Sequence, residues 1–352
     1  MSLPRYKYIQ PDTVTICHCF TRCVRRAFLC GFDPVTGRDF SHRKGWIVDR
    51  LRELGGIFAI DVIAFAVLVN HYHAILRTRP DLVAAWSDAE VATRWLTLFP
   101  ARDLFTGKAI PPTRKEIASL ARRPARIAVL RKRLSSLSWF MAQLNEHIAR
   151  AANKEDGVTG RFWESRFKCL ALLDESAIAA CMAYVDLNPL RAGLAATPED
   201  SDFTSIQLRL RAWRQAHMPA PGPDALPDPP HAEPRPRAED PSAWLCPIQS
   251  VAGRRGVLQM TETDYFELVD RTGRILKSGK RGAIDPDLAP ILRRIGAHPD
   301  AWIKTVSGFG SSFHLAAGLM SSLRNYAELL GRRWFVGLSA ARAAFESKPQ
   351  TA

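Results

Sequence analysis

The feature that most constrains the fold is a long apolar run that ends in two histidines. Residues Ile57 to Val69 are apolar except at Asp61, which predicts a buried strand. His71 and His73 follow, and because successive side chains of a strand point to opposite faces, the two imidazoles share one face. Two neighbouring imidazoles can hold a divalent metal ion. The pair alone does not establish a metal site, because a solvated strand also tolerates both rings.

A second informative segment, DESAIAACMAYVDLN, runs from Asp174 to Asn188 and precedes Pro189. Asp174 is a suitable N-cap and apolar residues recur at helical spacing, which predicts a helix. Tyr184 falls just beyond the edge of the apolar stripe, and Asn188 lies one turn further on. Pro189 disfavours helical geometry at Asn188, so the periodicity does not fix the direction of that side chain. Without the histidines, the simplest interpretation is that Tyr184 packs at the rim of the core.

The runs VNHYHAILRT, GRFWESRFKCLALLDE and YVDLNPLRAGL together resemble the single-tyrosine HUH transposases, and most of all their REP-associated branch. The resemblance covers roughly residues 10–207. It implies that His71 and His73 bind the metal, that Tyr184 is the nucleophile and that Asn188 is a third, polar ligand. It also implies hairpin or imperfect-palindrome DNA as the substrate, a 5′-phosphotyrosine intermediate and a homodimer.

The chemistry explains why these residue types belong together. A divalent cation stabilises the charge that phosphodiester cleavage places on the phosphate oxygens. Imidazole and amide ligands suit Mg²⁺ or Mn²⁺ modestly and favour Mn²⁺ of the two. A tyrosine phenol, with an ordinary pKa of about 10, attacks phosphorus only once it is activated. The sequence therefore predicts a metal-dependent enzyme that cleaves and rejoins single-stranded DNA.

The composition agrees with a nucleic-acid partner. The chain has 49 Lys and Arg against 35 Asp and Glu, a net charge of +14, and such a balance favours salt-dependent binding to phosphates. Basic residues mix with aromatic ones after Gly160, and they also crowd the stretch from Arg114 to Arg133. The DNA-binding candidates are Arg161, Trp163, Arg166, Lys168, Arg191, Arg131, Lys132 and Arg133. A solvated basic helix at Arg114–Arg133 and a core position for Trp163 are the simpler alternatives.

The order of predicted elements indicates an α+β fold, a ferredoxin-like antiparallel sheet with packed helices. We expect a nuclease domain over residues 1–213, with a helical basic insertion near 81–135 and a strand over 161–173. A Pro-rich linker spans 214–243. Residues 244–352 form a mostly helical accessory domain, for which DNA binding, dimerisation and a purely structural role all stay open.

Other features exclude some classes of protein. The cysteine spacing near the start of the chain does not match a zinc site, and no apolar run is long enough to span a membrane. The opening residues are polar, so we expect a cytoplasmic protein without disulfides. Two alternatives to the transposase remain at this point. One is a non-catalytic, domesticated DNA-binding protein, and the other is a metal phosphoesterase that uses water in place of Tyr184.

Overall fold

The computed structural model describes residue 9 and residues 12–24, 30–34, 36–217, 240–278, 299–332 and 337–345. The strands are β1 (Ile16–Arg22), β2 (Ile60–Val67), β3 (His71–Thr78), β4 (Ala101–Arg102), β5 (Ala109–Ile110), β6 (Lys168–Leu172) and β7 (Ala316–Ala317). The helices of the first two hundred residues are α1 (Arg43–Ile57), α2 (Pro80–Ala85), α3 (Asp88–Leu98), α4 (Arg114–Ala121), α5 (Pro124–Leu134), α6 (Leu137–Glu155), α7 (Glu175–Asp186) and α8 (Asn188–Arg191). Those that follow are α9 (Ser205–His217), α10 (Glu262–Ser278), α12 (Pro299–Ser312), α13 (Met320–Leu329) and α14 (Leu338–Phe345).

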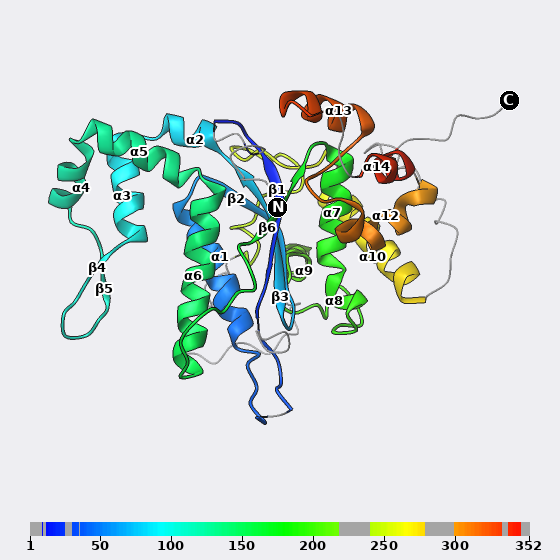
Figure 1. Ribbon diagram of the computed structural model, residues 1–352, viewed down its shortest axis with the longest axis horizontal. Coiled ribbons are helices and arrows are strands. Elements are labelled where there is room, and N and C mark those ends of the chain that lie inside the picture. Colours follow the sequence, from blue (N-terminus) through cyan, green and yellow to red (C-terminus); the bar gives the residue numbers. More distant parts are fainter. Residues whose placement is uncertain are drawn as a thin grey trace, which may run out of the picture.

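One five-stranded sheet in the order β2-β3-β1-β6-β7 forms the centre of the molecule (Figure 1). The first four strands pair antiparallel, and the short β7 pairs parallel to β6. In the register of β1 with β3, Arg22 lies opposite His71 and Phe20 lies opposite His73. Cross-strand partners share a face, so these four side chains lie together on one side of the sheet. The protein is therefore a mixed α and β structure, consistent with the predicted α+β class.

Helices cover both faces of the sheet (Figure 1). Helices α1 and α6 pack against the face that carries Cys17 and Tyr72. Helices α7, α10 and α12 pack against the opposite face, to which Ile75 and Leu170 belong. The alternation of side chains along β1 and β3 assigns His18 and His73 to this second face. The histidines therefore face α7, the helix that carries Tyr184.

The described residues after 240 contribute to the same hydrophobic core. Trp302, Phe309 and Tyr265 are fully buried in the cluster that contains the inner residues of α7. The backbone of β6 and β7 is joined by hydrogen bonds, among them Ala171 N–H to the carbonyl of Leu315 at 2.9 Å. The described part of residues 244–352 thus shares a core with α7. That these residues form a separate accessory domain stays a prediction. Most of the predicted Pro-rich linker lies outside the described residues.

One local expectation is wrong. The predicted strand over residues 161–173 is a strand only at Lys168–Leu172. Before it the chain makes a single β-bridge, between Cys23 and Trp163, and the Trp163 indole donates to the carbonyl of Asn145 on α6.

The predicted insertion near residues 81–135 contains α2 to α5 and the small β4–β5 hairpin. Figure 1 shows α3, α4 and the β4–β5 hairpin at the end of the molecule beyond α1 and α6, whereas α2 lies close to the five-stranded sheet. Thr113 and Glu116 cap α4 reciprocally, and Ser87 caps α3. Within the part of the chain that the structure describes, no helix is long and apolar enough to cross a membrane.

Candidate functional site

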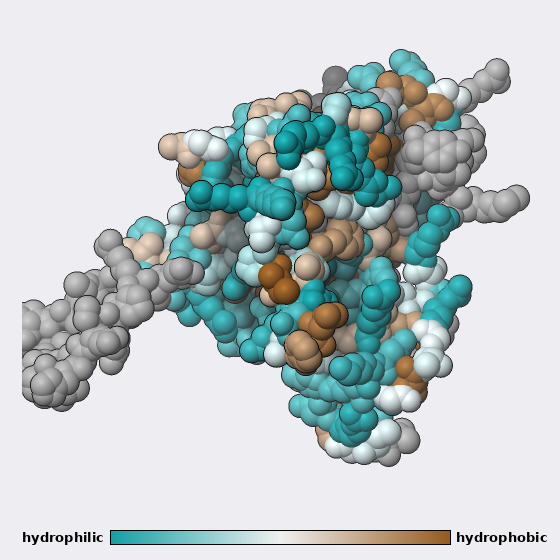
Figure 2. Space-filling model, turned by 90° about the vertical axis from the view of Figure 1, so that its left-hand side faces the viewer, coloured by the Kyte–Doolittle hydropathy of each residue, from teal (hydrophilic) through white to brown (hydrophobic). Residues whose placement is uncertain are grey.

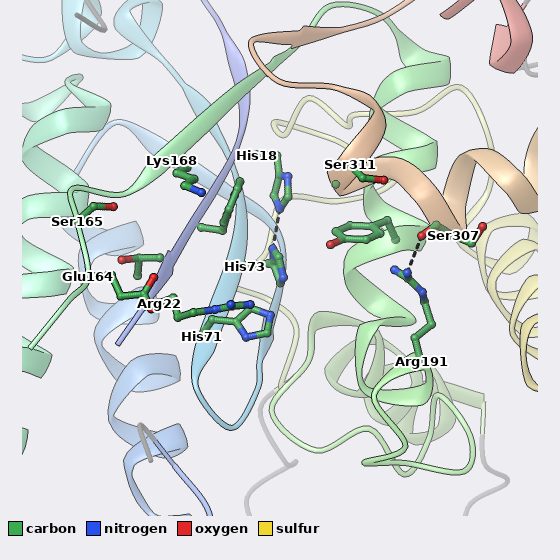
Figure 3. Close-up of a pocket in the computed structure, with 14 residues that line it drawn as sticks. His18, Arg22, His71, His73, Glu164, Ser165, Lys168, Arg191, Ser307 and Ser311 are labelled. Atoms are coloured by element: carbon green, nitrogen blue, oxygen red, sulfur yellow. Dashed lines mark hydrogen bonds between the residues drawn. The ribbon is translucent and has the colours of Figure 1, made fainter. Parts of the chain in front are cut away.

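A pocket of about 390 Å³ opens between the sheet, α7 and α12 (Figure 3). The strands contribute His18, Arg22, His71, His73 and Lys168 to its lining. The helical side contributes Tyr184, Arg191, Ser307, Gly310 and Ser311. The pocket thus brings together two of the predicted metal ligands, the predicted nucleophile and two of the predicted DNA-binding cations.

The histidines form a connected row with Asn188. His73 lies in the middle, with its Nδ1 2.8 Å from His18 Nε2 and its Nε2 3.3 Å from the Asn188 side-chain nitrogen. Figure 3 shows the His18 ring above His73 and the His71 ring below it. His71 Nδ1 lies 2.6 Å from Asn70 Oδ1, so it donates to that oxygen and its Nε2 carries the free lone pair.

All three imidazoles are held neutral. Burial lowers the pKa of His18 to about 3 and, together with the charge of Arg22, lowers the pKa of His71 to about 4. Burial lowers the pKa of His73 well below its ordinary value, and the neighbouring His18 and His71 add to the effect. A neutral imidazole is the form that can donate a lone pair to a metal ion.

Tyr184 stands next to these histidines. Its ring meets His73 edge to face at 5.6 Å between centroids and meets His18 in the same way at 5.9 Å. The Arg191 guanidinium lies over the Tyr184 ring, 5.1 Å from its centroid, and donates to the carbonyl of Ser307 at 2.5 Å. On the other side Phe309 packs against Tyr184 at 5.9 Å. The tyrosine is therefore only partly buried, between the metal-ligand candidates and α12.

A glycine on α12 leaves the room that the Tyr184 hydroxyl occupies. A Cβ atom built on Gly310 would lie 2.8 Å from the Tyr184 oxygen and 3.3 Å from Cζ. Real Cβ atoms essentially never come closer than 3.0 Å to another heavy atom, so any other residue here requires a displacement. The position of the hydroxyl thus depends on a residue more than a hundred positions later in the chain.

Both ends of α7 are tied to the later residues. Asp174 caps the helix by accepting from Ala177 N–H at 3.1 Å, as predicted, and its other oxygen accepts from Leu319 N–H at 2.6 Å. At the C-terminal end, the buried Asp186 accepts from the Tyr265 hydroxyl at 2.6 Å. Burial raises the pKa of the Asp186 carboxyl. These bonds fix α7 against the C-terminal elements and so fix Tyr184 in the pocket.

The predicted DNA-binding residues divide into those at the pocket and those away from it. Lys168 and Arg191 line the pocket, and Arg22, which the sequence analysis did not select, is a third cation there. Arg161 and Arg166 are exposed on the segment that leads into β6. Trp163 packs edge-on against Tyr72, which belongs to the core layer of α1 and α6, as the core alternative predicted.

The three DNA-binding candidates on α5 lie in the predicted insertion near residues 81–135, called the helical arm below, which contains α2 to α5 and the β4–β5 hairpin. Arg131 pairs with Asp88 at 2.7 Å and donates to the carbonyl of Val83, so it joins α5 to neighbouring helices. Arg133 stacks on Trp139 at 4.4 Å. Lys132 is exposed to solvent. The arm therefore uses two of these cations for packing, while Lys132 is available to a ligand.

Sequence analysis did not select His18, Ser307, Gly310 or Ser311. His18 had a signal, because it alternates with Cys17 and Cys19 on a predicted strand and therefore points to the opposite face. The α12 residues had none, since their place depends on the pairing of β7 with β6. Among the residues that the structure describes, no three His, Cys, Asp or Glu side chains form a metal-binding group.

No protein-family model matches this chain, and no curated protein matches it. Among solved structures, a REP-associated tyrosine transposase bound to a REP hairpin is similar to it, with a TM-score of 0.35 and 12% identity. The similarity covers 60% of this chain and 86% of that chain. Values this low indicate a distant fold relationship at most and carry no functional argument.

Proposed function

We propose that this protein is a metal-dependent single-tyrosine HUH transposase, which cleaves and rejoins single-stranded DNA through a 5′-phosphotyrosine intermediate. The observation that carries the proposal is the contact of Tyr184 with His73 inside a pocket lined by Arg22, Lys168 and Arg191. A proposed nucleophile, metal-ligand candidates and phosphate-binding cations come from five separate elements, β1, β3, β6, α7 and α8, and converge on one cavity.

The strand order supports a ferredoxin-like nuclease core. Strands β1, β2, β3 and β6 lie in the order β2-β3-β1-β6, and every pair is antiparallel. Helix α1 connects β1 to β2, and the segment with α2 to α6 connects β3 to β6. Each of these two connections skips one strand, and the histidines lie on a central strand that faces α7. This arrangement fits the core that the sequence resemblance implies.

The residues fit a divalent cation with His71, His73 and Asn188 as ligands. Two ligand atoms that each lie about 2.1 Å from one metal ion are about 3.0–3.5 Å apart. The distance of 3.3 Å between His73 Nε2 and the Asn188 amide agrees with this. The oxygen and nitrogen of an amide have nearly the same shape, so a rotation of the Asn188 side chain presents its oxygen instead. Mn²⁺ and Mg²⁺ are the cations we propose.

Around that site the outer contacts orient the ligands. Asn70 accepts from His71 Nδ1, and His18 accepts from His73 Nδ1, so both imidazoles present Nε2. Such hydrogen bonds to the second ring nitrogen are the usual support of metal-binding histidines. A bound cation would supply Lewis-acid stabilisation of the charge on the scissile phosphate.

The protein's own side chains carry out the attack on phosphorus and bind the phosphate. Tyr184 Oη attacks phosphorus and loses its proton to solvent, the bond from phosphorus to the 3′ oxygen breaks, and that oxygen takes up a proton from solvent. The products are a phosphotyrosine on the 5′ side and a free 3′ hydroxyl, which can reverse the reaction. Arg191 lies over the Tyr184 ring, where its charge favours the developing phenolate. Arg22 and Lys168 border the pocket on the sheet side and bind phosphate oxygens.

The test is an adduct assay with labelled single-stranded hairpins taken from the DNA around the gene. The protein is incubated with Mn²⁺ or Mg²⁺ and run on a denaturing gel beside Tyr184→Phe. A protease-sensitive DNA adduct that requires both metal and Tyr184 supports the proposal. Cleavage by Tyr184→Phe would show a water nucleophile instead. Binding without cleavage would identify a non-catalytic DNA-binding protein.

A further inference from the structure

The β4–β5 hairpin presents two large apolar side chains to solvent at its tip. Leu104 and Phe105 are each 96% exposed, more than any other large hydrophobic residue in the described part of the chain. Exposed side chains of this size leave their whole apolar surface in water, which folding alone does not favour. Ile110, at the other end of the hairpin, is also exposed, at 43%. The tip therefore has the composition of a contact surface rather than of an ordinary turn.

The turn that carries these residues is held in a defined shape. The Asp103 carboxylate accepts from Phe105 N–H at 3.1 Å, from Thr106 N–H at 2.6 Å and from the Thr106 hydroxyl at 2.8 Å. Gly107 closes the turn with a φ of +67° and donates to the Asp103 carbonyl at 2.9 Å. Asx turns of this kind pre-order a loop. Because the tip is ordered before it meets a partner, it loses little conformational entropy on binding.

Positive charge surrounds the tip. Arg102 and Lys108 flank the turn, and Arg114 and Lys115 begin the next helix. The nearby acids are committed to local structure, since Asp103 bonds the turn and Glu116 caps α4. Figure 2 faces this end of the molecule and shows small groups of hydrophobic side chains among hydrophilic ones. An apolar tip in a cationic setting complements unpaired bases between phosphates, because bases stack on rings while cations contact the backbone.

We propose that the β4–β5 tip is a DNA contact, in which Phe105 stacks on an unpaired base and Leu104 wedges beside it. This inference rests on the DNA substrate of the proposed function, but not on catalysis by Tyr184. Many DNA-binding proteins bind distorted DNA by inserting apolar side chains between base steps. The β4–β5 tip would hold a bulged or mismatched base of an imperfect hairpin, while the pocket holds the phosphate to be cut.

The experiment measures binding of a DNA hairpin with one bulged 2-aminopurine to the full chain in the Tyr184→Phe background. We compare Phe105→Ala and Leu104→Ala with Leu329→Ala, a 60% exposed residue on α13 that serves as the matched apolar control. Phe105→Ala should weaken binding about 5- to 150-fold, the usual range for loss of one stacked base, and should abolish the 2-aminopurine fluorescence change. Leu329→Ala should bind like the parent.

The salt dependence of DNA binding distinguishes the loss of base stacking from the loss of a phosphate contact. Phe105→Ala should leave the slope of log Kd against log salt unchanged, whereas Lys108→Ala should reduce it by about one phosphate contact. Equal affinities for Phe105→Ala and Leu329→Ala would overturn the proposal. The proposal would also be overturned if Phe105→Ala converted an oligomer to a monomer and kept the DNA affinity of the parent. In that case the tip would join two copies of the chain. Failure of the unsubstituted chain, with Tyr184 intact, to form an adduct would refute the catalytic proposal and leave this binding measurement intact.

Discussion

Replacement of Gly310 by alanine tests whether α12 sets the position of Tyr184, the proposed nucleophile. The added Cβ would lie 2.8 Å from the Tyr184 oxygen, so the hydroxyl or the helix must move by about 0.5 Å to reach an ordinary contact distance. The control is Gly308→Ala on the same helix. Its Cβ would meet only the Ser312 and Ser311 hydroxyl oxygens, at 3.3 Å and 3.9 Å.

Two opposing energies determine the effect on stability. Alanine is favoured over glycine inside a helix by about 1 kcal/mol, and both substitutions gain this. Overpacking at Gly310 costs about 1–3 kcal/mol, so Gly310→Ala should lose up to about 2 kcal/mol of unfolding free energy. In the Tyr184→Phe background the nearest atom becomes Cζ at 3.3 Å, and most of that cost should disappear. The coupling between the two substitutions should therefore be about 1–3 kcal/mol.

The assay combines urea unfolding of the four proteins in the cycle with single-turnover adduct formation. A displaced hydroxyl should slow the adduct step up to about 100-fold for Gly310→Ala, because attack requires well-aligned reacting atoms. Gly308→Ala should keep the parent rate. The reasoning is refuted if the coupling energy is near zero and the two alanine variants form adduct equally fast.

Four further outcomes follow from the geometry. His18→Gln should weaken Mn²⁺ binding about 10- to 100-fold by calorimetry, because His73 loses its orienting partner, and unchanged affinity would remove His18 from the site. Tyr265→Phe should lower the unfolding free energy by about 1–3 kcal/mol in urea, since the buried Asp186 loses a donor. Arg22→Ala should reduce the salt slope of DNA binding by about one contact, and an identical slope would exclude phosphate binding there. Burial raises the pKa of Cys30 to about 12 and of Cys246 to about 11, so a thiol reagent at pH 8 should label them only after unfolding, and rapid labelling of the native protein would contradict this.

The part of the site that could be predicted from sequence is the part with a local pattern. The shared face of His71 and His73 follows from a strand pattern, whereas Asn188 was expected at the site only from the family resemblance, and the structure brings the three into one row. Tyr184 lies beside them, as the helical periodicity placed it at the rim of the core. Their chemical roles remain proposals, since geometry alone does not show catalysis.

The rest of the site depends on contacts between distant segments. Gly310 reaches Tyr184 because β7, only two residues long, pairs with β6, and a pair of alanines gives no strand signal. The register of β1 with β3 sets Arg22 beside His71, and pairing registers are not readable from one strand alone. Trp163 was uncertain for a similar reason, because an aromatic residue in a basic run suits both DNA and a core. Tertiary packing against Tyr72 decided its position.

The dependence of Tyr184 on α12 has a consequence for the order in which the protein becomes active. A chain emerging from the ribosome presents both histidines and the tyrosine long before Gly310 and β7 are made, and early segments fold first. Until then the pocket lacks the wall formed by Ser307, Gly310 and Ser311. A product that stops between α7 and α12 therefore carries both histidines and Tyr184 and still lacks a finished pocket. Synthesis itself delays completion of the pocket until the chain has passed β7.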